Sequence, residues 1–164
     1  SVNLVLANIR GEEDNVDVPE SEVVESVKRS FFETRGSDKR TLIRVSREIE
    51  AWAWSDGAGE LHAGFQTIER FRDNMERDVY TSLAESDLDV HIYGVGEAPS
   101  DGEFTYHTED TEEIRDTWFV VHTGISPAAL VAEERESGVY YGFWTYSSDF
   151  VEEIARYLRS EYPS

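Results

Sequence analysis

The sequence predicts a single α/β domain of mixed α+β character, in which a sheet of five or six strands is packed by helices. Apolar residues recur at helical spacing in several segments, and short apolar runs bounded by turn residues lie between them. A chain of 164 residues with 39% hydrophobic residues can bury a sizeable core, and it is too apolar for a disordered acidic tail. The pattern includes a βαβ unit and an antiparallel hairpin.

The N-terminal part of the chain predicts a strand, a loop and a helix. Residues 2–9 form a short apolar run, and residues 11–22 are rich in acidic side chains, as in a solvated loop. From Ser21 to Phe31, the apolar spacing predicts a helix that stops before Gly36.

The middle of the chain predicts a βαβ unit. A helix with apolar residues over 42–52 leads to a strand at 61–66. The longest helical pattern covers 68–83 and can be capped by Thr67, and a strand at 90–95 follows it. Strand, helix and strand at this spacing predict a right-handed crossover between two parallel strands.

The second half predicts further strands. Residues 104–106 alternate as in a short strand, and residues 117–122 are nearly continuously apolar, as in a central strand buried on both faces. The segments 128–133 and 139–146 flank a tight turn at 136–138, which predicts an antiparallel hairpin. A last helix carries apolar residues from Phe150 to Leu158, and Ser148 or Asp149 is its predicted cap.

The formal net charge is −20, from 35 acidic and 15 basic side chains. Such a surface is repelled by phosphate backbones and by anionic membranes, so we expect no direct nucleic acid contact and no membrane contact by this segment. Lys28 and Lys39 are the only lysines, and excess carboxylate with scarce lysine is typical of adaptation to concentrated salt. The alternative is an ordinary acidic cytosolic domain.

We therefore expect the domain to lose stability on dilution from high into low salt. The Debye length is roughly 3 Å at about 1 M salt, so carboxylates that repel one another in dilute buffer are screened there. Melting temperatures measured in about 0.1 M and about 2 M KCl check this expectation, and equal values would contradict the adaptation to salt.

Several common chemistries are missing from the sequence. It has no cysteine, which excludes disulfides and thiolate catalysis. It also lacks a G-x-S-x-G nucleophile elbow, a dinucleotide-binding fingerprint and a G-K-[ST] phosphate loop, so we expect no enzyme activity, and no cofactor is identified. No run approaches the ~20 apolar residues of a membrane helix and no signal peptide is visible, so the expected location is cytoplasmic.

The four histidines lie in or beside predicted strands: His62, His91, His107 and His122. Neither an H-x-H nor an H-E-x-x-H spacing is present. Convergence in the fold stays open, but the spacing itself favours ordinary strand histidines and predicts no metal site.

The segment 139–146 is unusually aromatic. Tyr140, Gly142, Trp144 and Tyr146 share one face of the predicted strand, and Gly142 leaves room between large rings for a ligand or for a close backbone. A flat pocket with Trp144 as its floor is one interpretation. Its polar groups would come from Gln66, Arg70 or Glu133. The simpler interpretation, a sheet packed under the final helix, is favoured.

Taken in order, several motifs resemble the DICT sensory domain. They are S-R-E-I-E at 46–50, H-A-G-F-Q-x-x-x-R-F at 62–71, Y-x-x-L-A at 80–84, D-L-D-V-H-I-Y-G at 87–94, W-F-V-V at 118–121, A-A-L-V-A-E-E at 128–134 and G-F-W-T-Y at 142–146. The resemblance covers about residues 40–160.

The DICT family is named for its occurrence in diguanylate cyclases and two-component signalling proteins. The resemblance implies a non-catalytic input module of the haloarchaeal type, and no catalytic residue is carried over. The motif positions that would define a ligand pocket are Phe65, Gln66, Arg70, Glu133 and Trp144. Residues 1–39 lie outside the pattern, so we expect an N-terminal extension there, either a linker or a segment that pairs two chains, and the DICT-like domain at 40–162.

Two functions follow from these observations. The first is a sensory or regulatory domain of a signalling or transcription-regulatory protein, which binds a small molecule or a signalling partner. The alternative is a protein-interaction or dimerisation module without a small ligand, in which residues 1–35 and the strand at 139–146 build a homodimer interface.

Overall fold

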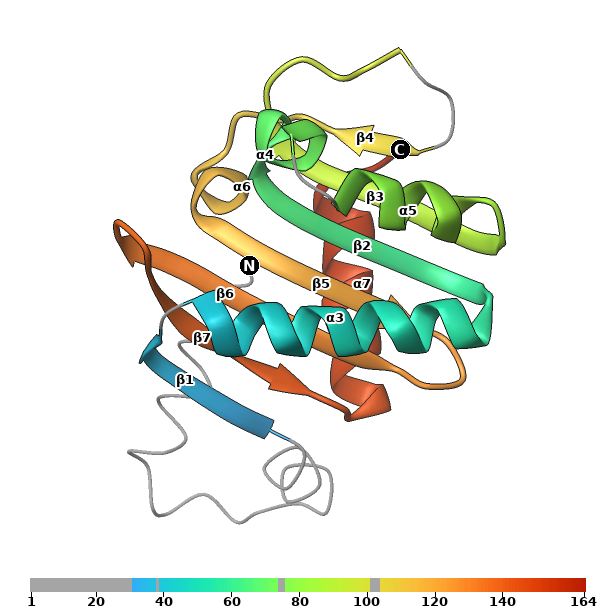
Figure 1. The fold of residues 1–164 in the computed structure, drawn as a ribbon, viewed down its shortest axis with the longest axis horizontal. Coiled ribbons are helices and arrows are strands. Elements are labelled where there is room, and N and C mark those ends of the chain that lie inside the picture. Colours follow the sequence, from blue (N-terminus) through green and yellow to red (C-terminus); the bar gives the residue numbers. More distant parts are fainter. Residues whose placement is uncertain (1–30, 38, 74–75, 101–103) are drawn as a thin grey trace.

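The structure is a computed structural model and describes residues 31–164, except 38, 74–75 and 101–103. Helices separate single strands and runs of consecutive strands along the described residues (Figure 1). In chain order they are β1 (Phe31–Ser37), α3 (Lys39–Asp56), β2 (Ala58–Thr67), α4 (Ile68–Asp73), α5 (Glu76–Ala84), β3 (Asp87–Val95), β4 (Thr105–His107), α6 (Glu112–Asp116), β5 (Thr117–Thr123), β6 (Ala128–Glu136), β7 (Val139–Thr145) and α7 (Ser148–Glu161). The predicted mixed α/β class is confirmed.

All of these strands form one mixed sheet in the order β1-β7-β6-β5-β2-β3-β4. The pairs β2–β3 and β3–β4 are parallel, and the other pairs are antiparallel. The parallel pairing predicted for the βαβ unit and the antiparallel hairpin are therefore confirmed. The segment predicted as a central strand, β5, lies in the middle of the sheet.

The sheet contains the six strands expected between residues 61 and 146, and β1 in addition. The helix predicted from Ser21 to Phe31, stopping before Gly36, is wrong at its C-terminal end, because Phe31–Ser37 is a strand. The reason is tertiary: β1 pairs antiparallel with β7, and this pairing overrides a weak helical pattern. The strand predicted at 2–9 and the rest of that helix lie outside the described residues. The division of the chain at residue 40 stays a prediction.

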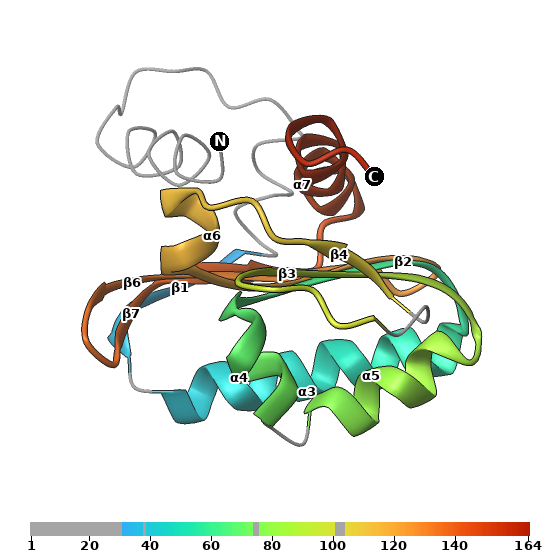
Figure 2. The same cartoon turned by 90° about the horizontal axis from the view of Figure 1, so that it is seen from above.

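The helices cover both faces of the sheet (Figure 2). Helices α3, α4 and α5 cover one face, and α6 and α7 cover the other. We call these the α3 face and the α7 face. Two apolar clusters fill the space between helices and sheet, because successive strand residues point to opposite faces. The α3-face cluster includes Leu42, Ile49, Leu61, Phe71 and Leu130, and the α7-face cluster includes Phe119, Val131, Phe143, Ile154 and Leu158.

Two helix predictions need correction. The single helix predicted over 68–83 is two helices, α4 and α5, and its start is capped as predicted, since the Arg70 N–H donates to Thr67 Oγ1 at 3.2 Å. The cap of α7 is Ser147, not Ser148 or Asp149: Ser147 Oγ accepts from the Phe150 N–H. Both differences concern where helices begin and end, which apolar spacing alone does not determine.

No helix among the described residues is long and apolar enough to cross a membrane.

Candidate functional site

Two neighbouring parallel strands carry the same short pattern, an acidic residue followed two positions later by histidine. The pattern is Glu60-x-His62 in β2 and Asp89-x-His91 in β3. The strands pair in a register that sets Glu60 beside Asp89 and His62 beside His91. Because side chains alternate along a strand, the four side chains share one face of the sheet, the α7 face.

These four side chains are in contact. His62 Nε2 lies 3.1 Å from Glu60 Oε1, and His91 Nε2 lies 3.0 Å from Asp89 Oδ2. The two imidazole rings stack with centroids 4.5 Å apart and planes 15° apart. Both carboxylates thus lie at the Nε2 side of a stacked histidine pair.

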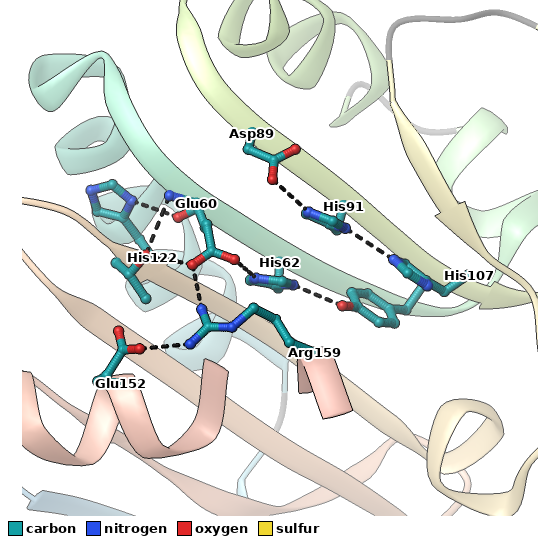
Figure 3. A network of polar contacts seen from close by, with 10 residues as sticks. Glu60, His62, Asp89, His91, His107, His122, Glu152 and Arg159 are labelled. Atoms are coloured by element: carbon teal, nitrogen blue, oxygen red, sulfur yellow. Dashed lines mark hydrogen bonds and ion pairs between the residues drawn. The ribbon is translucent and has the colours of Figure 1, made fainter. Parts of the chain in front are cut away.

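The histidine pair is extended by β4 and by the next residues of β3. His91 Nδ1 lies 2.9 Å from His107 Nε2, and His62 Nδ1 lies 2.7 Å from the Tyr93 hydroxyl. Tyr93 also stacks on the His107 ring with a centroid distance of 4.4 Å. The result is a row of polar side chains across β2, β3 and β4 (Figure 3). We call these residues, with the two carboxylates, the histidine row.

One side chain of α7 contacts the histidine row. The Arg159 guanidinium donates to Glu60 Oε2 through one nitrogen and to Glu152 Oε1 at 2.6 Å through the other. Glu60 therefore contacts a histidine with one carboxylate oxygen and α7 with the other (Figure 3).

Burial and hydrogen bonding shift the pKa values of His62, His107 and Glu60. Burial lowers the pKa of His62, and it lowers the pKa of His107 to about 4, with a further contribution from neighbouring His91. The hydrogen bond from His62 holds the pKa of Glu60 below its ordinary value, although partial burial opposes this. At neutral pH, the uncharged His62 ring therefore lies beside the ionised carboxylate of Glu60.

The histidine row offers ligands of the types that bind transition metals. One donor atom each of Glu60, His62 and His91 can be chosen so that all lie within 4.8 Å of one another. Imidazole nitrogen and carboxylate oxygen are common ligands of zinc and related ions. The spacing of the histidines along the sequence does not predict this group of three donors. The signal in the sequence was the repeated acid-x-His pattern in the two strands of the predicted βαβ unit.

His122, the remaining histidine, lies on the other face of the sheet. Its Nε2 lies 2.7 Å from Asp56 Oδ2 at the end of α3, and its Nδ1 lies 3.1 Å from the Glu60 carbonyl oxygen. Asp56 Oδ2 also accepts from the Ser126 N–H at 2.8 Å. The contacts of His122 and Asp56 therefore join α3, β5 and the loop after β5.

The predicted pocket residues form a second, separate cluster. Gln66 is buried and has a positive φ of 70°, which is uncommon for a residue other than glycine. Its Oε1 accepts from Arg70 and from the Tyr140 hydroxyl, and its Nε2 donates to Glu134 Oε1 at 3.3 Å. The structure thus brings Gln66 and Arg70 together on the α3 face.

The other predicted pocket residues have different positions. Phe65 packs in the α3-face core against Phe71 and Tyr80, and Trp144 packs partly buried against the same core. Glu133 lies on the α7 face, two residues after Val131, and pairs with Arg135. Its grouping with Gln66 is therefore wrong, because strand alternation turns the adjacent Glu134 toward Gln66 instead.

The space expected beside Gly142 is occupied by backbone. A Cβ at Gly142 would lie 1.9 Å from the Val131 carbonyl oxygen and 2.7 Å from Ala132 Cα. Of the two explanations for this glycine, the close backbone is confirmed and the ligand space is wrong. The aromatic strand β7 also pairs with β6 and β1 on its two sides, so it offers no free edge for a partner.

The family follows from comparison with known proteins. The model of the DICT family, the sensory domain in diguanylate cyclases and two-component systems, matches residues 21–135. The chain belongs to the DICT family, and its role is sensory. No protein of curated function matches the sequence at a significant level.

A solved structure has a similar fold. It is TrmBL2, an archaeal chromatin protein described as showing a novel mode of DNA binding. The TM-score is 0.55 with 11% identity, and the match covers 97% of this chain and 58% of that one. The chain thus spans less than two thirds of the length of TrmBL2. At this identity, the likeness concerns the fold alone.

Proposed function

We propose that the chain is the non-catalytic sensory domain of a signalling or transcription-regulatory protein, in the cytoplasm, and that it binds a small molecule or a partner protein. The sensory role of the DICT family supports the proposal. The net charge of −20 supports a domain that makes no nucleic acid contact of its own, whatever the protein around it does. The haloarchaeal origin stays a prediction.

The observation that carries the proposal is the contact of the histidine row with α7. Arg159 reaches Glu60 from a helix that packs on the sheet through apolar side chains, among them Val151, Ile154 and Leu158. A change at Glu60 would alter a polar contact of a packed helix, and small shifts of packed helices are a common form of signal transmission. We therefore take the strands as the input element and α7 as the output element.

We expect at least one class in a panel of metabolites to raise the melting temperature of the purified chain at high salt. A ligand at about 100 times its Kd stabilises the native state by about 2.7 kcal/mol. The same compound should change deuterium exchange in α7. In Arg159→Gln the compound should still raise the melting temperature, but the response of α7 should be weaker. Ligands that stabilise the chain without any effect on α7 would contradict its output role.

A second candidate is an interaction or dimerisation module without a small ligand. Helix α3 exposes Ile43 to 42% and Trp54 to 59%, and these residues lie about three turns apart, on one face of the helix. Exposed apolar side chains on one helix face favour a protein partner. No stabilising compound in the panel, together with a homodimer in light scattering that Trp54→Ala dissociates, would favour this function over the first.

A further inference from the structure

We propose that Glu60, His62 and His91 bind a divalent first-row transition-metal ion on the α7 face, with Asp89 at the open side of the site. The binding itself does not depend on the proposed function. Only its coupling to α7 rests on that function.

The positions of the donor atoms are the first argument. The three donors lie within 4.8 Å of one another. Around a tetrahedral ion with bonds of about 2.0 Å, ligand atoms lie roughly 3.3 Å apart. On binding, the side chains would rotate so that the donor atoms approach one another and the two stacked rings tilt toward one ion. The ion would replace the hydrogen bond between Glu60 Oε1 and His62 Nε2, which now measures 3.1 Å.

The second nitrogen of each ring is the second argument. A histidine that binds a metal usually forms a hydrogen bond through its other ring nitrogen, which fixes the orientation of the ring. His62 Nδ1 has the Tyr93 hydroxyl at 2.7 Å, and His91 Nδ1 has His107 Nε2 at 2.9 Å. When the ion binds, each ring carries its proton on Nδ1 and donates it to these partners. Both Nε2 lone pairs are then free to point toward the carboxylates.

The exposure of the side chains and the type of donor atom indicate which ions can bind. The imidazoles are buried, whereas the side chain of Glu60 is 23% exposed and that of Asp89 is 62% exposed, so an ion can enter from the carboxylate side. Two of the proposed donors are nitrogen atoms, which suit Zn²⁺, Co²⁺ or Ni²⁺ better than Ca²⁺ or Mg²⁺, since these prefer oxygen ligands.

The link to α7 runs through Glu60. Its Oε2 accepts from Arg159, so an ion at Oε1 withdraws negative charge from that hydrogen bond. Under the proposed function, occupation of the site would weaken the contact between β2 and α7.

The test is a titration of the metal-free chain with Co²⁺, followed by displacement with Zn²⁺. About 2 M KCl screens diffuse binding to surface carboxylates. We expect one site per chain with visible d–d absorption typical of nitrogen and oxygen ligands. Glu60→Gln and His91→Gln should weaken binding at least 10-fold. Glu152→Gln is the matched control, because Glu152 also binds Arg159 but lies away from the imidazoles, and it should leave the affinity unchanged.

His122→Gln is the control for the loss of a buried histidine. His122 lies on the α3 face and contacts the backbone carbonyl of Glu60, not its carboxylate, so this variant should weaken metal binding far less than His91→Gln. Should His91→Gln fail to fold, Glu60→Gln and X-ray absorption of the Zn²⁺ form, with two imidazoles bound, decide the question. No Co²⁺ binding by the wild type, equal binding in Glu60→Gln, or equal affinity for Ca²⁺ would overturn the proposal.

The two proposals fail in different ways. A spectroscopically normal site that leaves deuterium exchange in α7 unchanged would remove the coupling and retain the metal site. A chain that binds no metal, but whose α7 responds to another ligand, would remove the metal site and retain the sensory function.

Discussion

Gly142→Ala is expected to destabilise the domain by about 3 kcal/mol or more. The new Cβ would lie 1.9 Å from the Val131 carbonyl oxygen and 2.8 Å from the Val131 carbonyl carbon. Both atoms belong to the backbone of β6, which is paired to β7 and β5, so they cannot move without breaking ladder hydrogen bonds. Urea denaturation with a two-state fit measures the loss.

Gly138→Asn is the matched control for this substitution. Gly138 also lies at the β6–β7 hairpin and has a φ of +77°, and a Cβ added there would have no heavy atom within 4 Å. Asparagine tolerates this left-handed backbone better than other residues with a Cβ, so we expect a change below about 1 kcal/mol. A loss in Gly142→Ala no larger than in Gly138→Asn would show that β6 and β7 are not so close at this point.

Asp56→Ala is expected to lower the free energy of unfolding by about 3 kcal/mol. The substitution leaves the buried His122 Nε2 and the Ser126 N–H without their hydrogen-bond acceptor. Burial alone would raise the pKa of Asp56, but hydrogen bonds from His122 and Ser126 outweigh it and lower the pKa below 3.8. The stabilisation is therefore complete above the unfolded-state value and is lost as the pH falls through the lower folded-state value.

The pH dependence distinguishes this role from simple loss of packing. Between about pH 5 and pH 2, the wild type should lose more unfolding free energy than Asp56→Ala, since the variant has already lost this carboxylate. Asp110→Ala is the control: Asp110 forms an exposed pair with Arg115 and should change stability by less than about 1 kcal/mol. Parallel pH profiles of the wild type and Asp56→Ala would contradict the expected role.

Much of the fold could be predicted because its signals are local. The apolar run of β5, the spacing of α3 and the alternation in β6 and β7 each lie within one segment, and all were found. β1 could not be recognised in this way. Its conformation depends on pairing with β7, more than a hundred residues along the chain, and such a contact leaves little trace in a local pattern.

The candidate site was harder to predict for a related reason. The spacing of His62 and His91 in the sequence does not predict their contact, which depends on the parallel pairing and the register of β2 and β3. His107 joins only when β4 is added at the edge of the sheet. The incorrect grouping of Glu133 with Gln66 has the same cause. Neighbouring residues of β6 point to opposite faces of the sheet, so Glu134 and not Glu133 contacts Gln66.

The parallel strands at this edge have a consequence for the folding of the domain. Glu60 contacts His62 in its own strand, and His62 stacks on His91, which lies beyond a helical crossover. Arg159, which also contacts Glu60, lies 99 residues after it in the sequence. A site built from contacts of such sequence separation cannot form within one segment of the chain, because β2, β3 and α7 must first be brought together. An ion or another ligand bound there would therefore stabilise the assembled domain over forms in which these elements are apart.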